Sequence, residues 1–121
     1  MKLTESHISL NALRFHAYHG VLPQEKVVGN DYLVDLVIGY NVAAAVENDD
    51  ISMAINYADV WQTVREVMLT PCQLIETVAS NICKHLEKQF PQMTSLEVTV
   101  TKLNPPVGGE CQGASVKLCY K

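Results

Sequence analysis

Apolar and polar residues alternate along four stretches of the chain, which is the pattern of a β-strand that buries one face. Gly20 and Pro23 mark a loop after the first stretch, and Asn104-Pro105-Pro106 ends the third, because proline cannot donate to a sheet ladder. The four predicted strands are Ser6–Ala17, Asn30 to about Ala44, Leu96–Thr101 and Ala114–Tyr120.

The second predicted strand has one continuous apolar face and one mixed face. Its odd positions place Asp31 and Asp35 beside Leu33 and Val37. We therefore expect helices to cover the clean face and a partner subunit to touch the mixed one. The even positions that make the clean face are Tyr32, Val34, Leu36, Ile38 and Tyr40.

Two stretches between the second and third strands have the apolar period of an amphipathic helix. The first ends at Thr70-Pro71 and the second near Phe90-Pro91, because the residue before a proline avoids the helical conformation. The order ββααββ predicts one α+β domain over residues 1–121, with a four-stranded antiparallel sheet and two helices on one face. The helix stripes are Val60, Trp61, Val64, Val67 and Met68, then Ile75, Val78, Ala79, Ile82 and Leu86.

Composition narrows the class of protein. The chain has 121 residues, 48% hydrophobic and 18% charged, which suits one globular domain. Its net charge of −4 disfavours nucleic acid as a partner, because phosphate binding needs clustered Lys and Arg. No apolar run reaches the ~20 residues of a membrane-spanning helix, and no secretory signal is visible. We expect a cytoplasmic protein without a membrane partner.

Histidine and cysteine spacing points to no metal or other cofactor. The four histidines do not form an H-E-x-x-H motif, and no acidic or thiol partner stands at ligand spacing from His16 and His19. The four cysteines contain no C-x-x-C pair, so we expect free thiols in or near the core rather than disulfides. These cysteines are Cys72, Cys83, Cys111 and Cys119.

Several charged and aromatic residues break the local pattern, and such breaks mark candidate functional positions. Lys102 has the parity of the inward-facing residues of its strand, so its ammonium either reaches out at the strand end or serves proton transfer. Glu76 lies in the first turn of the second helix, where it complements the helix N-terminus or binds two parallel N–H groups. Tyr57 follows Asn56, a candidate N-cap, and Glu25 follows a Gly-Pro loop, where a solvated carboxylate is the default.

Four motifs that contain these residues strongly resemble the dihydroneopterin aldolase family, whose members act in folate biosynthesis. The resemblance covers nearly the whole chain, with the motifs in the family's order and at familiar spacings. The chain departs from the family at Val107–Gly113, where many members have a proline-glycine turn and an aspartate. The motifs are FHAYHGVLPQE (15–25), NYADV (56–60), LIETVA (74–79) and TKLNPP (101–106).

The resemblance implies a tunnelling fold, in which four subunits join their sheets into a barrel and two such rings stack into an octamer. It also implies retro-aldol cleavage of 7,8-dihydroneopterin, a pterin, to 6-hydroxymethyl-7,8-dihydropterin and glycolaldehyde, without a metal or a Schiff base. The ring's own C=N bond would accept the electrons that other aldolases pass to zinc or to a lysine imine. The protein then has to supply only positioning and proton transfer.

The family's site residues carry over to positions within the four motifs. Lys102 is implied as the general acid/base, and Tyr57 of a neighbouring subunit as an assistant in protonating the enol. Glu25 is implied beside the substrate's side-chain hydroxyls, and Glu76 as the acceptor for the 2-amino and N3 groups of the pterin. The remaining substrate-binding positions are backbone groups around Val21, Ile55, Leu74 and Ile75.

Two alternatives remain at this point: an epimerase of dihydroneopterin on the same scaffold, and a non-catalytic pterin-binding subunit. The presence of both Lys102 and Tyr57 argues against the second, since binding alone needs chiefly Glu76. A triphosphate substrate is disfavoured because the loop from Tyr18 to Gly29 offers only Lys26 as a base. Pyruvoyl-tetrahydropterin synthase, a sibling fold, would need a three-histidine zinc site that is not evident.

Overall fold

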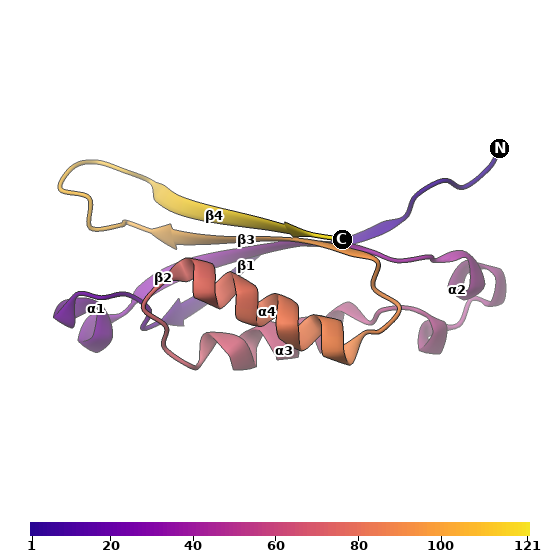
Figure 1. Cartoon of the computed structure of the whole chain (residues 1–121), viewed down its shortest axis with the longest axis horizontal. Helices are drawn as coiled ribbons and strands as arrows, with labels where there is room; N and C mark the ends of the chain where they lie inside the picture. The colour runs from indigo at the N-terminus through magenta and orange to yellow at the C-terminus, as the bar shows by residue number, and fades with distance from the viewer.

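Four antiparallel strands form one sheet in the order β1-β2-β3-β4 in a computed structural model that describes all 121 residues. Two long helices, α3 (Tyr57–Met68) and α4 (Ile75–Gln89), lie along one face of this sheet (Figure 1). The predicted α+β class and the antiparallel sheet are confirmed. The strands are β1 (His7–Ala17), β2 (Asn30–Gly39), β3 (Ser95–Leu103) and β4 (Gly113–Tyr120).

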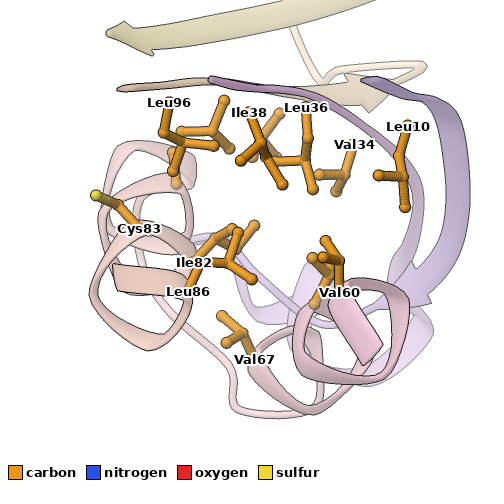
Figure 2. Close-up of a cluster of buried hydrophobic side chains, with 14 of the residues drawn as sticks. Leu10, Val34, Leu36, Ile38, Val60, Val67, Ile82, Cys83, Leu86 and Leu96 are labelled. Atoms are coloured by element: carbon orange, nitrogen blue, oxygen red, sulfur yellow. The ribbon is translucent and has the colours of Figure 1, made fainter. Parts of the chain in front are cut away.

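The core fills the space between the sheet and these two helices (Figure 2). The five positions of the predicted apolar face are buried, four of them in β2 and the fifth, Tyr40, directly after it, and Leu96, Val98 and Val100 of β3 lie beside them. Removing this apolar surface from water, at roughly 25 cal/mol per Å², is what holds α3 and α4 on the sheet. The helices contribute Val60, Val64, Val67, Met68, Val78, Ala79, Ile82, Cys83 and Leu86.

The two long helices begin and end close to the predicted residues. Asn56 is the N-cap of α3, because its side-chain oxygen accepts a hydrogen bond from the backbone N–H of Ala58 at 2.9 Å. The helix ends at Met68, before Pro71, and α4 ends at Gln89, before Pro91. The predicted capping and proline signals are therefore confirmed.

The sequence pattern did not predict three short helices, which are α1 (Pro23–Val28), α2 (Ala43–Asn48) and the 3-10 turn η1 (Ile51–Met53). The prediction that the second strand continues to Ala44 is wrong, because β2 ends at Gly39. A run of three alanines favours helix over strand, and the Asn41 side chain accepts from the backbone N–H of Ala43 at 2.9 Å. Pro23 fits the first turn of α1, where its missing N–H is not needed.

A β-bulge interrupts the alternation in β1. The pairing with β2 shifts register between Leu10 and Leu13, and Ala12 takes a positive φ of 52°. Ala12 is consequently exposed, although the alternation placed it with Ile8 and Leu10. The Asp35 carboxylate accepts a hydrogen bond from the Ala12 backbone N–H at 2.8 Å, which gives this charged residue of β2 a structural role.

All four cysteines are free, as expected. Their predicted place in or near the core is right for Cys83, which is buried, and for the half-buried Cys72. It is wrong for Cys111 and Cys119, which are exposed. Cys119 lies on the outward-facing row of β4, between the partly buried Leu118 and Tyr120. None of the helices has the length and apolar character needed to cross a membrane.

Candidate active site

Lys102 and Glu25 form an enclosed ion pair within one chain. The Lys102 Nζ lies 2.5 Å from Oε2 of Glu25, and the two side chains are only 13% and 9% exposed. Lys102 stands near the end of β3, and Glu25 lies in the first turn of α1. Both default interpretations are thus wrong: the ammonium does not reach into solvent at the strand end, and the carboxylate is not solvated.

Local structure holds the Glu25 carboxylate in this place. The backbone N–H of Leu22 also donates to Glu25, at 3.4 Å from Oε1. The hydrogen bond from Lys102 outweighs the effect of burial and lowers the pKa of Glu25. At Gly20, whose φ is +130°, a Cβ would stand 2.5 Å from the carboxylate atoms, so only glycine fits beside this pair.

Tyr32 lies beneath the ion pair, directly opposite Lys102 in the sheet. The Lys102 Nζ is 5.9 Å from the centroid of its ring. The Tyr32 hydroxyl donates to the backbone oxygen of His19 at 3.0 Å. Burial, with a further contribution from the Glu25 charge, raises the pKa of Tyr32 to about 12, so the phenol stays neutral at pH 7. The alternation along β2 predicted Tyr32 only as a core residue.

His19 is the second group near the pair that sequence analysis did not select. It is 1% exposed, and its ring meets the edge of Tyr32 with centroids 5.1 Å apart. Burial, and then the charge of Lys102, lower the pKa of His19 to about 4. The ring is therefore neutral at pH 7. The Tyr18-His19-Gly20 motif was a signal of its importance, but nothing local in the sequence indicates that this histidine is buried.

The other predicted site residues lie outside this enclosed pair. Tyr57, at the start of α3, is 65% exposed, and no hydrogen bond, ion pair or ring contact joins it to Lys102 or Glu25. Glu76 is exposed in the first turn of α4, as predicted. Of the four predicted backbone positions, the structure exposes Val21 and Leu74, half-buries Ile75 and buries Ile55.

A hollow of about 290 Å³ separates the loop before α1 from the segment before α4. Its walls include Tyr18, Gly20 and Lys26 on one side and Cys72 and Gln73 on the other. The backbone N–H of Gly20 donates to the Cys72 oxygen at 2.9 Å, which ties the two sides together. This hollow lies next to the loop that leads to Glu25 and to the segment that leads to Glu76.

The chemistry available at the ion pair is proton transfer. A poorly solvated ammonium in contact with a carboxylate can exchange a proton with a ligand bound beside it. No group of three or more His, Cys, Asp or Glu side chains is gathered closely enough to hold a metal ion.

Comparison with known proteins identifies the class to which this fold and site belong. The family model described as FolB, dihydroneopterin aldolase, matches residues 8–119. Dihydroneopterin aldolase of Staphylococcus epidermidis is 33% identical over 112 residues, covering 92% of this chain and 93% of the relative. That of Streptococcus pyogenes serotype M1 is 32% identical over 112 residues, covering 92% and 94%. The chain belongs to the dihydroneopterin aldolase family.

Solved structures agree with the fold. A putative dihydroneopterin aldolase from Vibrio cholerae superposes with a TM-score of 0.88 at 24% identity, covering 98% of both chains. The Escherichia coli dihydroneopterin aldolase, solved in complex with neopterin, gives a TM-score of 0.88 at 19% identity, covering 96% of this chain and 99% of that one. These likenesses confirm the predicted tunnelling fold of the subunit.

Family membership also settles the reaction class. The chain is an aldolase that cleaves 7,8-dihydroneopterin in a retro-aldol reaction of folate biosynthesis, as the four motifs indicate. Neither the epimerase nor the non-catalytic alternative is favoured by these relatives.

Proposed function

We propose that the Lys102–Glu25 pair is the proton-transfer centre of the retro-aldol reaction. The observation that carries this proposal is the enclosed contact between the two side chains, with Lys102 Nζ 2.5 Å from Glu25 Oε2. An ammonium needs a compensating charge when it leaves water. Here that charge comes from a glutamate 77 residues away in the sequence, on the loop that the family resemblance places beside the substrate's hydroxyls.

The reaction requires two proton movements and one bond cleavage. The Lys102 ammonium first passes a proton to the Glu25 carboxylate that it contacts. The resulting amine, acting through a water, takes the proton of a side-chain hydroxyl as the adjacent carbon–carbon bond breaks and glycolaldehyde forms. The bonding electron pair enters the C=N bond of the dihydropterin ring, which leaves an enol. Return of a proton from the pair to that enol at carbon, assisted by Tyr57, gives 6-hydroxymethyl-7,8-dihydropterin and restores the ammonium–carboxylate pair. Glu25 contacts both the ammonium and the hydroxyl side of the substrate, so it aligns donor and acceptor.

The ligand of the hollow beside this pair is a pterin. Glu76 is exposed at the start of α4, with a carboxylate suited to two parallel N–H donors. The 2-amino and N3 groups of a pterin form such a pair of donors. Two structural neighbours support this choice, since one was solved with neopterin and another, from Burkholderia thailendensis, was solved bound to guanine. Backbone groups around Val21, Ile55, Leu74 and Ile75 complete the pterin's polar edge.

The working enzyme is a homotetramer or homo-octamer with active sites between subunits. Three observations support this assembly. Tyr57 is open to solvent and without contact to Lys102 of its own chain, β1 and β4 are free sheet edges, and Val21 and Leu74 expose apolar surface beside the hollow. Light scattering should give the mass of four or eight chains, and a fully active monomer would contradict the proposal.

The function is tested by incubating the purified chain alone with 7,8-dihydroneopterin and separating the products by chromatography. We expect 6-hydroxymethyl-7,8-dihydropterin and glycolaldehyde in equal amounts. Formation of the epimer alone would establish the epimerase alternative. Binding of the pterin without any turnover would establish a non-catalytic subunit.

A further inference from the structure

The buried side chain that this mechanism leaves unused is His19. Its Nε2 is the one buried side-chain nitrogen or oxygen in the structure without a hydrogen-bond partner. Leaving a donor unpaired in the interior costs free energy. A residue that bears this cost at 1% exposure, next to the ion pair, calls for an explanation beyond core packing, for which an apolar ring would serve better.

His19 and Gly20 are held against Cys72 by two hydrogen bonds that run in opposite directions. The Cys72 backbone N–H donates to Nδ1 of His19 at 3.0 Å, and the Gly20 backbone N–H donates to the Cys72 oxygen at 2.9 Å. A third bond, from the Tyr32 hydroxyl to the His19 backbone oxygen at 3.0 Å, fixes the same residue to β2. The loop before α1 is thus pinned between the sheet and the segment before α4.

This arrangement requires a neutral imidazole with its hydrogen on Nε2. Nδ1 can accept from Cys72 only through its free lone pair, and an imidazolium has none. The titratable residues next to the ring are Lys102 on β3, Tyr32 on β2 and Cys72 before α4, while the Glu25 carboxylate lies beside the adjacent Gly20. The nearby ammonium opposes a second positive charge on the ring. The side chain is therefore suited to hold the loop and not to act as a base.

The loop position that His19 sets determines where Glu25 lies. Gly20 follows His19 directly, and its Cα leaves no room even for a Cβ beside the Glu25 carboxylate. A displacement of residues 19 and 20 would therefore move the carboxylate away from Lys102 or drive it into contact with the loop.

We propose that His19 is a positioning residue: its neutral ring clamps the loop onto Cys72 and thereby sets the Glu25 carboxylate against the Lys102 ammonium. The inference rests on the proposed catalytic role of the Lys102–Glu25 pair. This role is indirect and does not require His19 to contact the reacting atoms. It acts through Gly20 and Glu25.

Two substitutions at His19 separate its hydrogen bond from its volume. His19→Phe keeps an aromatic ring against Tyr32 and removes the acceptor for the Cys72 N–H. His19→Asn is smaller but keeps a side-chain oxygen close to the place of Nδ1. The control is His85→Phe, which replaces an exposed histidine on α4 whose Nδ1 lies 2.8 Å from the Asn81 backbone oxygen.

We expect His19→Phe to lower kcat by about 10–100-fold, with KM for 7,8-dihydroneopterin changed by less than about 3-fold, because the carboxylate shifts by a fraction of an ångström. His19→Asn should recover most of kcat, and His85→Phe should match the wild type. A folded His19→Phe with wild-type kcat would overturn the inference. So would equal losses in the Phe and Asn variants, because the acceptor would then play no part.

Nitrogen NMR of the wild-type protein provides a test that does not depend on folding of a variant. The His19 ring should show the Nε2–H tautomer from pH 5 to pH 8, and a ring that becomes charged near pH 6.5 would overturn the inference. Lys102→Ala is measured in parallel. If that variant keeps full activity, the proposed catalytic centre is wrong. If it is inactive while His19→Phe is normal, only the positioning role of His19 is wrong.

Discussion

The candidate site has two parts. Lys102 and Glu25 form an enclosed half that a single chain completes, whereas Tyr57 and Glu76 form an open half on the surface of the chain. The enclosed half is held by residues far apart in sequence: His19, Gly20 and Tyr32 surround the pair from two sides. On the open half, Tyr57 is 65% exposed. We propose that a second chain and the substrate complete this half.

The difference indicates a division of labour. An ammonium in a poorly solvated place has to be held by built-in contacts at all times, because an unpaired buried charge destabilises the fold. Residues that recognise a ligand edge must instead stay open until the ligand arrives. The enclosed half should therefore govern chemistry and stability together, while the open half should govern affinity and the fate of the product.

The largest effect should follow from changes at Lys102. Lys102→Ala should lower the rates of cleavage and of any epimerisation by about 10²–10⁴-fold, as is typical for loss of a general acid/base, with a much smaller loss of pterin affinity. Lys102→Arg is the matched control. It retains the charge opposite Glu25, but a guanidinium does not give up its proton. An active Arg variant would show that the charge matters and proton transfer by this residue does not.

The enclosed carboxylate should matter more for stability than the open one. Glu25→Ala leaves the Lys102 ammonium without its partner and should lower the free energy of unfolding by about 3–5 kcal/mol. Glu76→Ala removes only an exposed carboxylate from a helix N-terminus, worth about 0.3–1 kcal/mol. Urea denaturation of both variants checks this contrast. Equal losses would mean that the Glu25–Lys102 contact adds no stability.

Lowering the pH should destabilise the protein through His19 and Glu25. The pKa of His19 is about 4 in the folded state and about 6.5 when unfolded, so the unfolded chain binds more protons between these values. Stability should therefore fall by on the order of 2–3 kcal/mol as the pH decreases from 6.5 to 4. Glu25, whose pKa is lowered by Lys102, adds a further loss as the pH falls below its unfolded value and through its folded one.

Protonation of His16 should offset part of this loss of stability at acid pH. Its hydrogen bond to Asp31 raises the pKa of this exposed ring, so its contribution is present below pH 6.5 and is lost as the pH rises through the folded value. Urea midpoints measured from pH 7 to pH 4 test the balance. The urea midpoint should change less steeply with pH in His19→Asn, because the asparagine side chain cannot be protonated. An unchanged slope would show that His19 is not the group responsible.

Periodicity and capping predicted the parts of the fold that depend on neighbours in sequence. The buried face of β2, the N-cap of α3 at Asn56 and the ends of both long helices follow from such local rules. The bulge at Ala12 does not, because it depends on Asp35 in the paired strand. Similarly, α2 looked like a strand because its apolar residues continue those of β2, although alanines favour a helix.

In the candidate site, too, local sequence patterns did not predict contacts between residues that are distant in the sequence. The parity of Lys102 indicated that its ammonium faces inward, but its partner lies 77 residues away in sequence, and no local pattern names it. Glu25 was a candidate because it follows a Gly-Pro loop, but only the family resemblance gave it a role beside the substrate. His19 was missed because burial and contact with Cys72, 53 residues along the chain, arise only in the folded protein.

On the open half, Glu76→Gln should weaken binding more than catalysis. A pterin edge presents two donors, and an amide opposes one of them with its own NH₂ group. The loss of a charge-assisted pair of hydrogen bonds corresponds to about 1.5–3 kcal/mol, or roughly 10–150-fold in Kd. Titration with neopterin measures it, with Glu66→Gln, an exposed glutamate on α3, as the control. Unchanged affinity would leave Glu76 as a helix-terminus carboxylate only.

Tyr57→Phe should have the smallest effect on stability and on bond cleavage, and it should change mainly the ratio of the products. The side chain is exposed, so loss of its hydroxyl should change stability by less than about 0.5 kcal/mol, and bond cleavage by Lys102 should still occur. If the hydroxyl assists protonation of the enol, that intermediate should persist, recombine with glycolaldehyde or react with oxygen. The epimer and oxidised products should then increase relative to 6-hydroxymethyl-7,8-dihydropterin. Chromatography of the products, with Lys102→Ala beside it, gives the ratio. An equal decrease of every product would place the hydroxyl before bond cleavage, and the open half would then share in the chemistry that we assign to the enclosed pair.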